Sequence, residues 1–193
     1  MRRGSLYITG DSEADQLLNT QPLALLIGML LDQQISMELA FIGPARLSER
    51  LAHPLDAGRI AAIDPEEFAE LVKMKPALHR FPGSMAARIQ QLCQHLVDNY
   101  DGDAEAIWRG VRRGDVVFQR LVALPGYGEE KARIFVAILA KRFGKRPAGW
   151  EDAAGPFADA TPRSVADIHS EQSLATVREW KKEQKARGRA KAD

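Results

Sequence analysis

The apolar residues of this chain recur at helical spacing, and one run dominates the pattern. Residues 23–31 are apolar on nearly every side, and the polar residues Asp32, Gln33 and Gln34 follow at once. A helix without a polar face belongs in the interior of a domain. The pattern therefore predicts a buried helix over residues 23–34 that ends in three polar residues.

Weaker helical patterns occupy most of the remaining chain. We expect further helices over residues 36–51, 56–63, 66–73, 84–98, 104–109 and 173–187, with Ser84 and Asp115 as the N-caps of the helices that begin there. No alternating strand pattern occurs beyond the first residues, and no internal repeat is present. The predicted fold class is all-α, a compact array of short helices.

The motif Leu124-Pro125-Gly126-Tyr127-Gly128 separates two apolar helical patterns. Pro125 ends the first helix, and the two glycines permit a tight turn with positive φ and close approach of the backbone. The next helix opens with unpaired N–H groups, which form an anion site. A nucleic-acid phosphate is the natural ligand of such a helix-hairpin-helix, although an ordinary turn between two helices fits the same residues.

The composition narrows the classes of protein to which this chain can belong. Its 193 residues are 45% hydrophobic, enough for one sizeable domain, and its formal net charge is +1. The single cysteine, Cys93, excludes a disulfide framework within the chain and a four-cysteine zinc or iron–sulfur site, so we expect no cofactor and no metal. We find no apolar signal segment after the basic residues 1–3 and no apolar run long enough to span a bilayer, so we expect a cytoplasmic protein without membrane contact.

Basic residues crowd the end of the chain although its net charge is small. The last stretch contains Arg178, Lys181, Lys182, Lys185, Arg187, Arg189 and Lys191. Such a segment either lies along DNA through phosphate contacts or remains a solvated tail. Of these two interpretations we favour the solvated tail.

Two separated motifs, taken together, resemble one known family. Residues 25–34 and residues 124–128 with Ala132 agree in order and spacing with the helix-hairpin-helix DNA glycosylases of the endonuclease III superfamily, the HhH-GPD proteins. The resemblance covers residues 20–152 and implies a compact multi-helix fold with a reduced second subdomain, without the iron–sulfur cluster of several members. It also implies a base excision repair protein, near the nucleoid, that acts on double-stranded DNA with a damaged or mismatched base. We expect a monomer.

The resemblance assigns DNA-contacting roles to particular residues. Gln34, with Gln33 beside it, matches the residue that fills the gap left by a flipped base, and Phe81 matches the apolar wedge that unstacks the neighbouring bases. The expected contacts to the DNA backbone are Pro125, Gly126, Tyr127, Gly128 and Lys131. The alternatives are a polar helix end for Gln34 and a core aromatic for Phe81.

At the catalytic positions the chain departs from the family pattern. Bifunctional members carry a nucleophilic lysine two residues after the second hairpin glycine, where this chain has Glu130. Lys131 follows one residue later, a rotation of about 100° on a helix, and it takes over that role only if the hairpin is wound differently by one residue. The essential aspartate of the family falls on Glu151 or, after a one-residue slip, on Asp152.

The candidate catalytic residues are therefore Glu151, Asp152, Lys131 and Glu130. We expect a monofunctional enzyme in which a carboxylate activates water, and a non-catalytic DNA-binding protein on the same fold is the alternative. Residues 150–152 also fit the polar first turn of a short helix.

The same patterns divide the chain into four parts. An N-terminal segment, residues 1–20, is expected to pack with the C-terminal part of the chain, and residues 21–145 form the helical core, with the hairpin at residues 121–142. A loop rich in Gly, Pro and Ala, residues 146–170, carries the candidate carboxylate, and residues 171–193 form a basic helix and tail.

Overall fold

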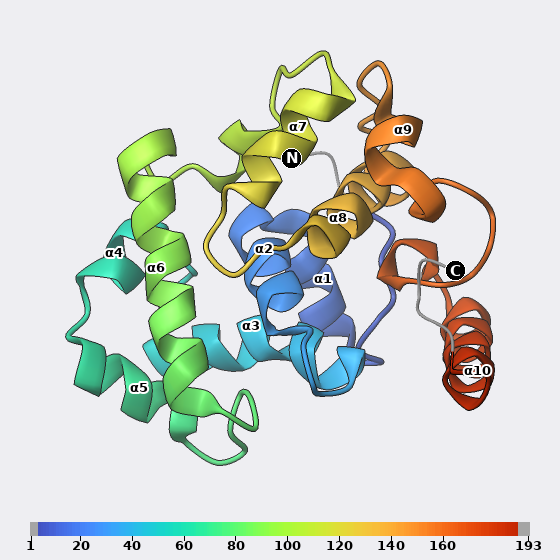
Figure 1. Ribbon diagram of the computed structural model, residues 1–193. Coiled ribbons are helices and arrows are strands. Elements are labelled where there is room, and N and C mark those ends of the chain that lie inside the picture. Colours follow the sequence, from blue (N-terminus) through green and yellow to red (C-terminus); the bar gives the residue numbers. More distant parts are fainter. Residues whose placement is uncertain (1–3, 189–193) are drawn as a thin grey trace.

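The computed structural model describes residues 4–188, and these form helices connected by short loops (Figure 1). The α-helices are α1 (Ser12–Thr20), α2 (Pro22–Leu31), α3 (Met37–Leu51), α4 (Ala57–Ala62), α5 (Pro65–Lys73), α6 (Pro82–Tyr100), α7 (Gly114–Val122), α8 (Glu129–Arg142), α9 (Trp150–Ala154) and α10 (Glu171–Ala186). Three 3₁₀ turns are η1 (Ala104–Ile107), η2 (Gly155–Phe157) and η3 (Val165–Asp167). Within residues 4–188 the only strand-like pairing is an isolated bridge between Arg113 and Ala148, so the predicted all-α class is confirmed.

Helix α2 lies at the centre of the molecule, with α4 to α6 on one side and α8 to α10 on the other (Figure 1). Every residue from Leu23 to Leu31 is buried, as its continuous apolar pattern predicts. The helix ends at Leu31, three residues earlier than we expected, so Asp32, Gln33 and Gln34 belong to the loop that follows it. Residues 32–36 are called the α2 loop below.

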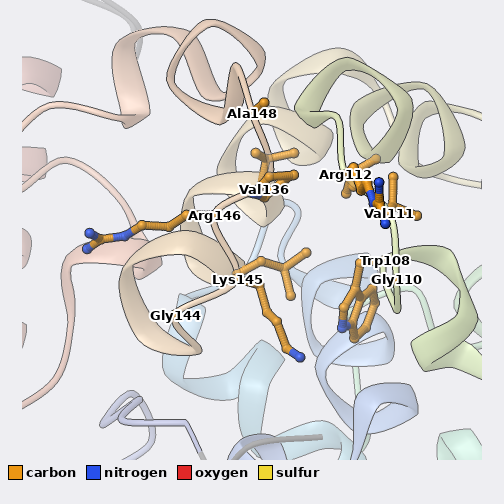
Figure 2. A pocket seen from close by; sticks show the side chains of 12 residues that line it. Trp108, Gly110, Val111, Arg112, Val136, Gly144, Lys145, Arg146 and Ala148 are labelled. Carbon is orange, nitrogen blue, oxygen red and sulfur yellow. The ribbon is translucent and has the colours of Figure 1, made fainter.

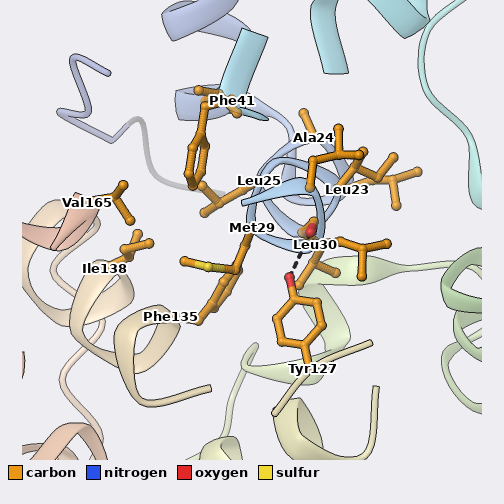
Figure 3. Close-up of a cluster of buried hydrophobic side chains, with 14 of the residues drawn as sticks. Leu23, Ala24, Leu25, Met29, Leu30, Phe41, Tyr127, Phe135, Ile138 and Val165 are labelled. Atoms are coloured by element: carbon orange, nitrogen blue, oxygen red, sulfur yellow. Dashed lines mark hydrogen bonds between the residues drawn. The ribbon is translucent and has the colours of Figure 1, made fainter. Parts of the chain in front are cut away.

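Close contact between α2 and α3 depends on Gly28. A Cβ atom at this position would lie 2.8 Å from Cδ1 of Phe41, closer than van der Waals contact allows. Phe41 is fully buried and packs beside Leu25 and Met29 in the core (Figure 3). Helix α3 continues through Pro44 without a break.

Helices α4 and α5 pack against α6, which is the longest helix of the described part. Helix α6 begins at Pro82 with Phe81 at its N-cap, so the predicted N-cap at Ser84 is wrong. Proline is well suited to the first helical position because its missing N–H would be unpaired there. Arg50 of α3 holds the loop between α5 and α6, since its guanidinium donates to the Leu71 and Pro76 carbonyls, each at 2.6 Å.

The hairpin helices α7 and α8 pack against each other and against α9, and the turn between them lies against α2. Helix α7 begins at Gly114, so Asp115 lies in its first turn rather than at the predicted N-cap. Phe135 of α8 lies beside Trp108, with ring centroids 5.5 Å apart, and beside Tyr127.

The two ends of the described chain attach to different surfaces. Helix α1 packs against α2 and α3, and Gly4 lies against the ring of Phe143 at the end of α8. Helix α10 is tied to α3 by an ion pair in which Arg178 Nε lies 2.6 Å from Glu38 Oε1. Of the basic tail predicted at residues 171–193, residues 189–193 lie outside the described residues.

Candidate nucleic-acid interface

The α2 loop begins directly after the last residue of α2, where the Asp32 N–H donates to the Gly28 carbonyl. Gln34 is exposed and has φ of 56°, a left-handed backbone conformation that non-glycine residues rarely adopt. Its side chain makes no hydrogen bond within residues 4–188. A strained residue that projects a polar side chain outward is typical of a functional site and is unlike an ordinary helix end.

Gln33, in contrast, is fixed within the protein through both its backbone and its side chain. Its Nε2 donates to the Leu30 carbonyl at 2.8 Å, and its Oε1 accepts from Arg88 Nη1 at 2.8 Å. Its backbone carbonyl accepts from His79 Nε2 at 2.7 Å. These bonds use the groups that would otherwise contact DNA, so Gln33 supports the α2 loop on α6 and on the α5–α6 loop.

His79 connects the α2 loop to Phe81. The His79 ring is buried, with Nδ1 accepting from the Phe81 N–H at 3.1 Å while Nε2 donates to Gln33. These two bonds define a neutral ring with its proton on Nε2. The Phe81 side chain is 45% exposed, and the Arg80 guanidinium lies 4.7 Å from its ring centroid. Phe81 is therefore a surface aromatic beside a cation, and the alternative of a core aromatic is excluded.

The hairpin turn brings one glycine close to the end of α2. Gly126 has φ of 80°, and a Cβ atom there would lie 2.4 Å from Leu30 Cδ1. Gly128 has φ of −98° and ψ of 175°, and a Cβ atom there would meet nothing within 4 Å. The expectation of positive φ is thus right for Gly126 and wrong for Gly128. Gly128 leaves an open surface in front of the first turn of α8.

The side chain of Tyr127 turns inward, so any contact of this residue with DNA would have to come from its backbone. It is buried, and its hydroxyl donates to the Leu26 carbonyl at 2.7 Å, as the dashed line in Figure 3 shows. Burial raises the pKa of this hydroxyl well above its usual value. Tyr127 therefore anchors the hairpin on α2, and Pro125, which is partly buried, and Gly126 form the outer edge of the turn.

Lys131 lies on the face of α8 that meets α2. Its Nζ donates to the Leu30 carbonyl at 2.7 Å, the same oxygen that accepts from Gln33. The hairpin and the α2 loop therefore converge on one backbone atom. Glu130, the neighbouring candidate, is exposed at the start of α8.

The predicted carboxylates Glu151 and Asp152 lie elsewhere, in the exposed first turn of α9. Asp152 lines a shallow pocket together with Arg113 and Arg133. Arg133 is two residues from Lys131, which places it about 200° around α8 and on the opposite face. The pocket that Asp152 lines contains none of Gln34, Phe81 and Lys131.

Asp32 is a carboxylate that the sequence analysis did not select. It lines a pocket of about 490 Å³ between the α2 loop and α10, together with Gln34, Glu38 and Lys181. Its carboxylate has no hydrogen bond or ion pair within residues 4–188. The sequence feature that could have indicated Asp32 is its position directly before Gln33 and Gln34.

Two other titratable side chains, those of Cys93 and Glu38, have structural rather than catalytic roles. Burial raises the pKa of Cys93 to about 12, with Asp56 adding to the shift, so this thiol is a core side chain. Burial also acts to raise the pKa of Glu38, but its own backbone N–H and the Arg178 guanidinium outweigh burial and lower the pKa below 4.5. Glu38 therefore stays ionised beside the pocket that Asp32 lines.

The described part has neither a cluster of metal-ligating side chains nor a helix that could span a membrane. Residues 4–188 contain no group of three His, Cys, Asp or Glu side chains placed to hold a metal ion. None of the helices in this range is both long enough and apolar enough to cross a bilayer.

These features define a helical protein in which a helix-hairpin-helix and the α2 loop meet at the end of the buried helix α2. A family model described as HhH-GPD superfamily base excision DNA repair protein matches residues 27–192. The chain belongs to this superfamily. The resemblance seen in the sequence is thereby confirmed.

Comparison with solved structures gives two examples with modest similarity. A non-covalent endonuclease III–DNA complex is 22% identical, with 83% of this chain and 67% of that chain covered and a TM-score of 0.47. A trapped endonuclease III–DNA covalent intermediate is 20% identical, with 86% and 73% covered and a TM-score of 0.45. Among curated proteins, no relative matches the sequence.

Proposed function

We propose that this protein is a DNA glycosylase that takes a damaged or mismatched base out of the duplex and hydrolyses its glycosidic bond. The observation that carries the proposal is the Leu30 carbonyl, which accepts from both Lys131 Nζ and Gln33 Nε2. This atom joins the phosphate-binding turn to the loop that presents Gln34. Because a base must leave the stack before its glycosidic bond is attacked, an enzyme of this kind needs both parts at a fixed separation.

Gln34 and Phe81 are suited to the two tasks that follow base flipping. The exposed amide of Gln34 can pair with the base left behind, and the exposed Phe81 ring can stack in the opened step. His79 couples their positions, since it bonds the carbonyl of the residue before Gln34 and the N–H of Phe81. The Arg80 cation next to Phe81 favours the approach of a phosphate backbone.

The proposed reaction is monofunctional. Lys131 lies one position beyond the family lysine, and its Nζ donates to the Leu30 carbonyl of α2, so this side chain is held against the protein rather than presented to a sugar. Hydrolysis instead needs a carboxylate that accepts a proton from water while water attacks the sugar carbon and the base departs. Asp32 is favoured over Glu151 and Asp152 for this role because it shares a pocket with Gln34.

A second candidate function is damage recognition without chemistry. It is favoured by Glu130 at the family lysine position and by Asp152 on the opposite side of α8 from Lys131. Such a protein would keep Gln34, Phe81 and the hairpin as a DNA-binding surface.

The test is cleavage of duplexes that each carry one lesion: uracil, an alkylated purine, an oxidised pyrimidine, or 8-oxoguanine opposite adenine. Each duplex is assayed with and without alkali, and with borohydride trapping. Strand scission only after alkali, with no trapped adduct, is the expected result. A trapped adduct that disappears in Lys131→Ala would replace the monofunctional mechanism, and lesion-selective binding without scission would favour the recognition protein.

A further inference from the structure

Another pocket lies at the C-terminal end of α8, at the opposite end of this helix from the hairpin turn. It has a volume of about 390 Å³ and is walled by Trp108, Val111, Val136 and Leu139, with the loops 108–112 and 144–148 on either side (Figure 2). We call it the Trp108 pocket. No predicted DNA-contacting or catalytic residue lines it.

The wall of the Trp108 pocket contains a hydrogen-bond donor without an acceptor. Trp108 is 4% exposed, and its indole Nε1 has no partner within residues 4–188. A buried N–H that lacks a partner costs roughly 1–3 kcal/mol, so native proteins keep few of them. An acceptor atom supplied from outside the chain would remove this cost.

The charged side chains of the pocket also favour an acceptor. Its lining includes Arg112, Lys145 and Arg146 and no carboxylate. Figure 2 shows Lys145 extending toward Trp108, with the indole nitrogen on the side that faces the ammonium, whereas Arg146 points away. Arg146 instead lies over the Trp150 ring, 5.9 Å from its centroid. The neutral indole N–H of Trp108 and the charged ammonium of Lys145 are thus two donors that face each other in the Trp108 pocket.

The frame of the pocket is held by backbone bonds that do not involve its ligand-facing side chains. The Ala148 N–H donates to the Arg112 carbonyl at 2.8 Å, and the Gly114 N–H donates to the Ala148 carbonyl at 2.8 Å. The Lys145 N–H donates to the Leu139 carbonyl at 2.9 Å. The two loops are therefore fixed relative to α8, and the flexible stem of Lys145 is the part that can move to admit a ligand.

We propose that the Trp108 pocket binds a small organic anion whose apolar body rests on the valine and leucine wall. One anionic oxygen accepts from Trp108 Nε1–H and from the Lys145 ammonium, and Arg112 adds to the positive potential at the mouth. Carboxylates and phosphates share this chemistry. The site is separate from the DNA surface and does not depend on glycosylase activity.

The experiment follows the Trp108 indole N–H by ¹H–¹⁵N NMR in the Trp150→Phe/Trp180→Phe variant, which retains Trp108 as its only tryptophan. Benzoate and phenyl phosphate are titrated separately, and benzamide serves as the uncharged ring of the same shape. We expect at least one anion to shift this signal in a saturable manner, with benzamide binding at least about tenfold more weakly.

A lysine variant and a matched control decide whether the cation takes part. Lys145→Met keeps the apolar stem and should weaken anion binding at least about tenfold, whereas Lys182→Met, an exposed lysine of α10, should leave it unchanged. Absence of a saturable shift with both anions would overturn the proposal, as would equal binding of benzamide or an unaltered affinity in Lys145→Met.

Discussion

At the scale of single residues, neighbours of similar chemistry have different tasks. The side-chain amide of Gln33 is hydrogen-bonded to Leu30 and Arg88. The next residue, Gln34, has a strained backbone conformation and an exposed side chain. The same contrast holds for Tyr127, which is buried, and Phe81, which is exposed. Residue type alone does not tell which residue supports the fold and which is available to a ligand. The hydrogen-bond partners and the exposure of each side chain make that distinction.

Gln34→Gly should separate stability from function. Glycine adopts φ of 56° without strain, although it has more freedom to lose on folding, so the free energy of unfolding should stay within about 1 kcal/mol of wild type or rise. Binding to a lesion-containing duplex should weaken because the gap-filling amide is gone. Urea unfolding and titration of a fluorescent duplex measure the two quantities. A clear loss of stability with unchanged binding would assign Gln34 a structural role.

Asp32→Asn tests which carboxylate activates water. Its carboxylate follows the negative end of the α2 dipole, so neutralisation should slightly stabilise the fold while lowering the glycosylase rate at least about 100-fold. Single-turnover rates and duplex affinity should be measured alongside Glu151→Gln and Asp152→Asn. We expect affinity to persist in all three and the rate to fall in Asp32→Asn. Loss of rate in either α9 variant, with Asp32→Asn active, would return the role to α9.

At the scale of elements, the sequence predicts those helices and turns that a continuous run of residues determines. The buried α2 follows from nine consecutive apolar residues, and the hairpin follows from Pro125 and its glycines. The ends of helices were less certain, as at Phe81, because a cap depends on which backbone groups remain unpaired. The location of Asp152 could not be predicted, since the course of residues 144–149 is set by Ala148 bonding to Arg112 and Gly114, which no local signal indicates.

The hairpin should bind DNA through the open surface at Gly128. Gly128→Val adds atoms where a Cβ meets nothing and φ suits a β-branched residue, so the free energy of unfolding should fall by at most about 1 kcal/mol. A phosphate that approaches the first turn of α8 would meet the new methyl groups, and duplex affinity should fall at least about tenfold.

Two other glycines serve as controls for this experiment. Gly58→Val introduces the same side chain at an exposed position of α4 and should bind DNA as wild type does. Gly126→Ala should instead destabilise the fold, because its Cβ would overlap Leu30 and φ is positive. If Gly128→Val binds DNA as tightly as Gly58→Val, the hairpin is not the contact surface.

At the scale of the whole molecule, the C-terminal helix α10 lies beside the α2 loop and the start of α3. The pocket that Asp32 lines has one wall from this loop and one from α10, so its shape depends on how α10 docks. The ion pair between Glu38 and Arg178 is one charged contact between the two walls. We infer that docking of α10 is linked to protonation of Glu38.

The sign of this pH dependence follows from the lowered pKa of Glu38. A carboxylate whose folded pKa lies below its unfolded value of 4.5 contributes stability above that pH and loses it as the pH falls through the folded pKa. A double-mutant cycle with Glu38→Gln and Arg178→Gln, measured by urea unfolding, should give a coupling of about 1 kcal/mol or less at pH 7, because Arg178 is partly exposed. The coupling should shrink steadily below pH 4.5. A coupling that stays constant down to pH 3 would show that the two side chains act through packing rather than charge, and docking of α10 would then not be linked to protonation of Glu38.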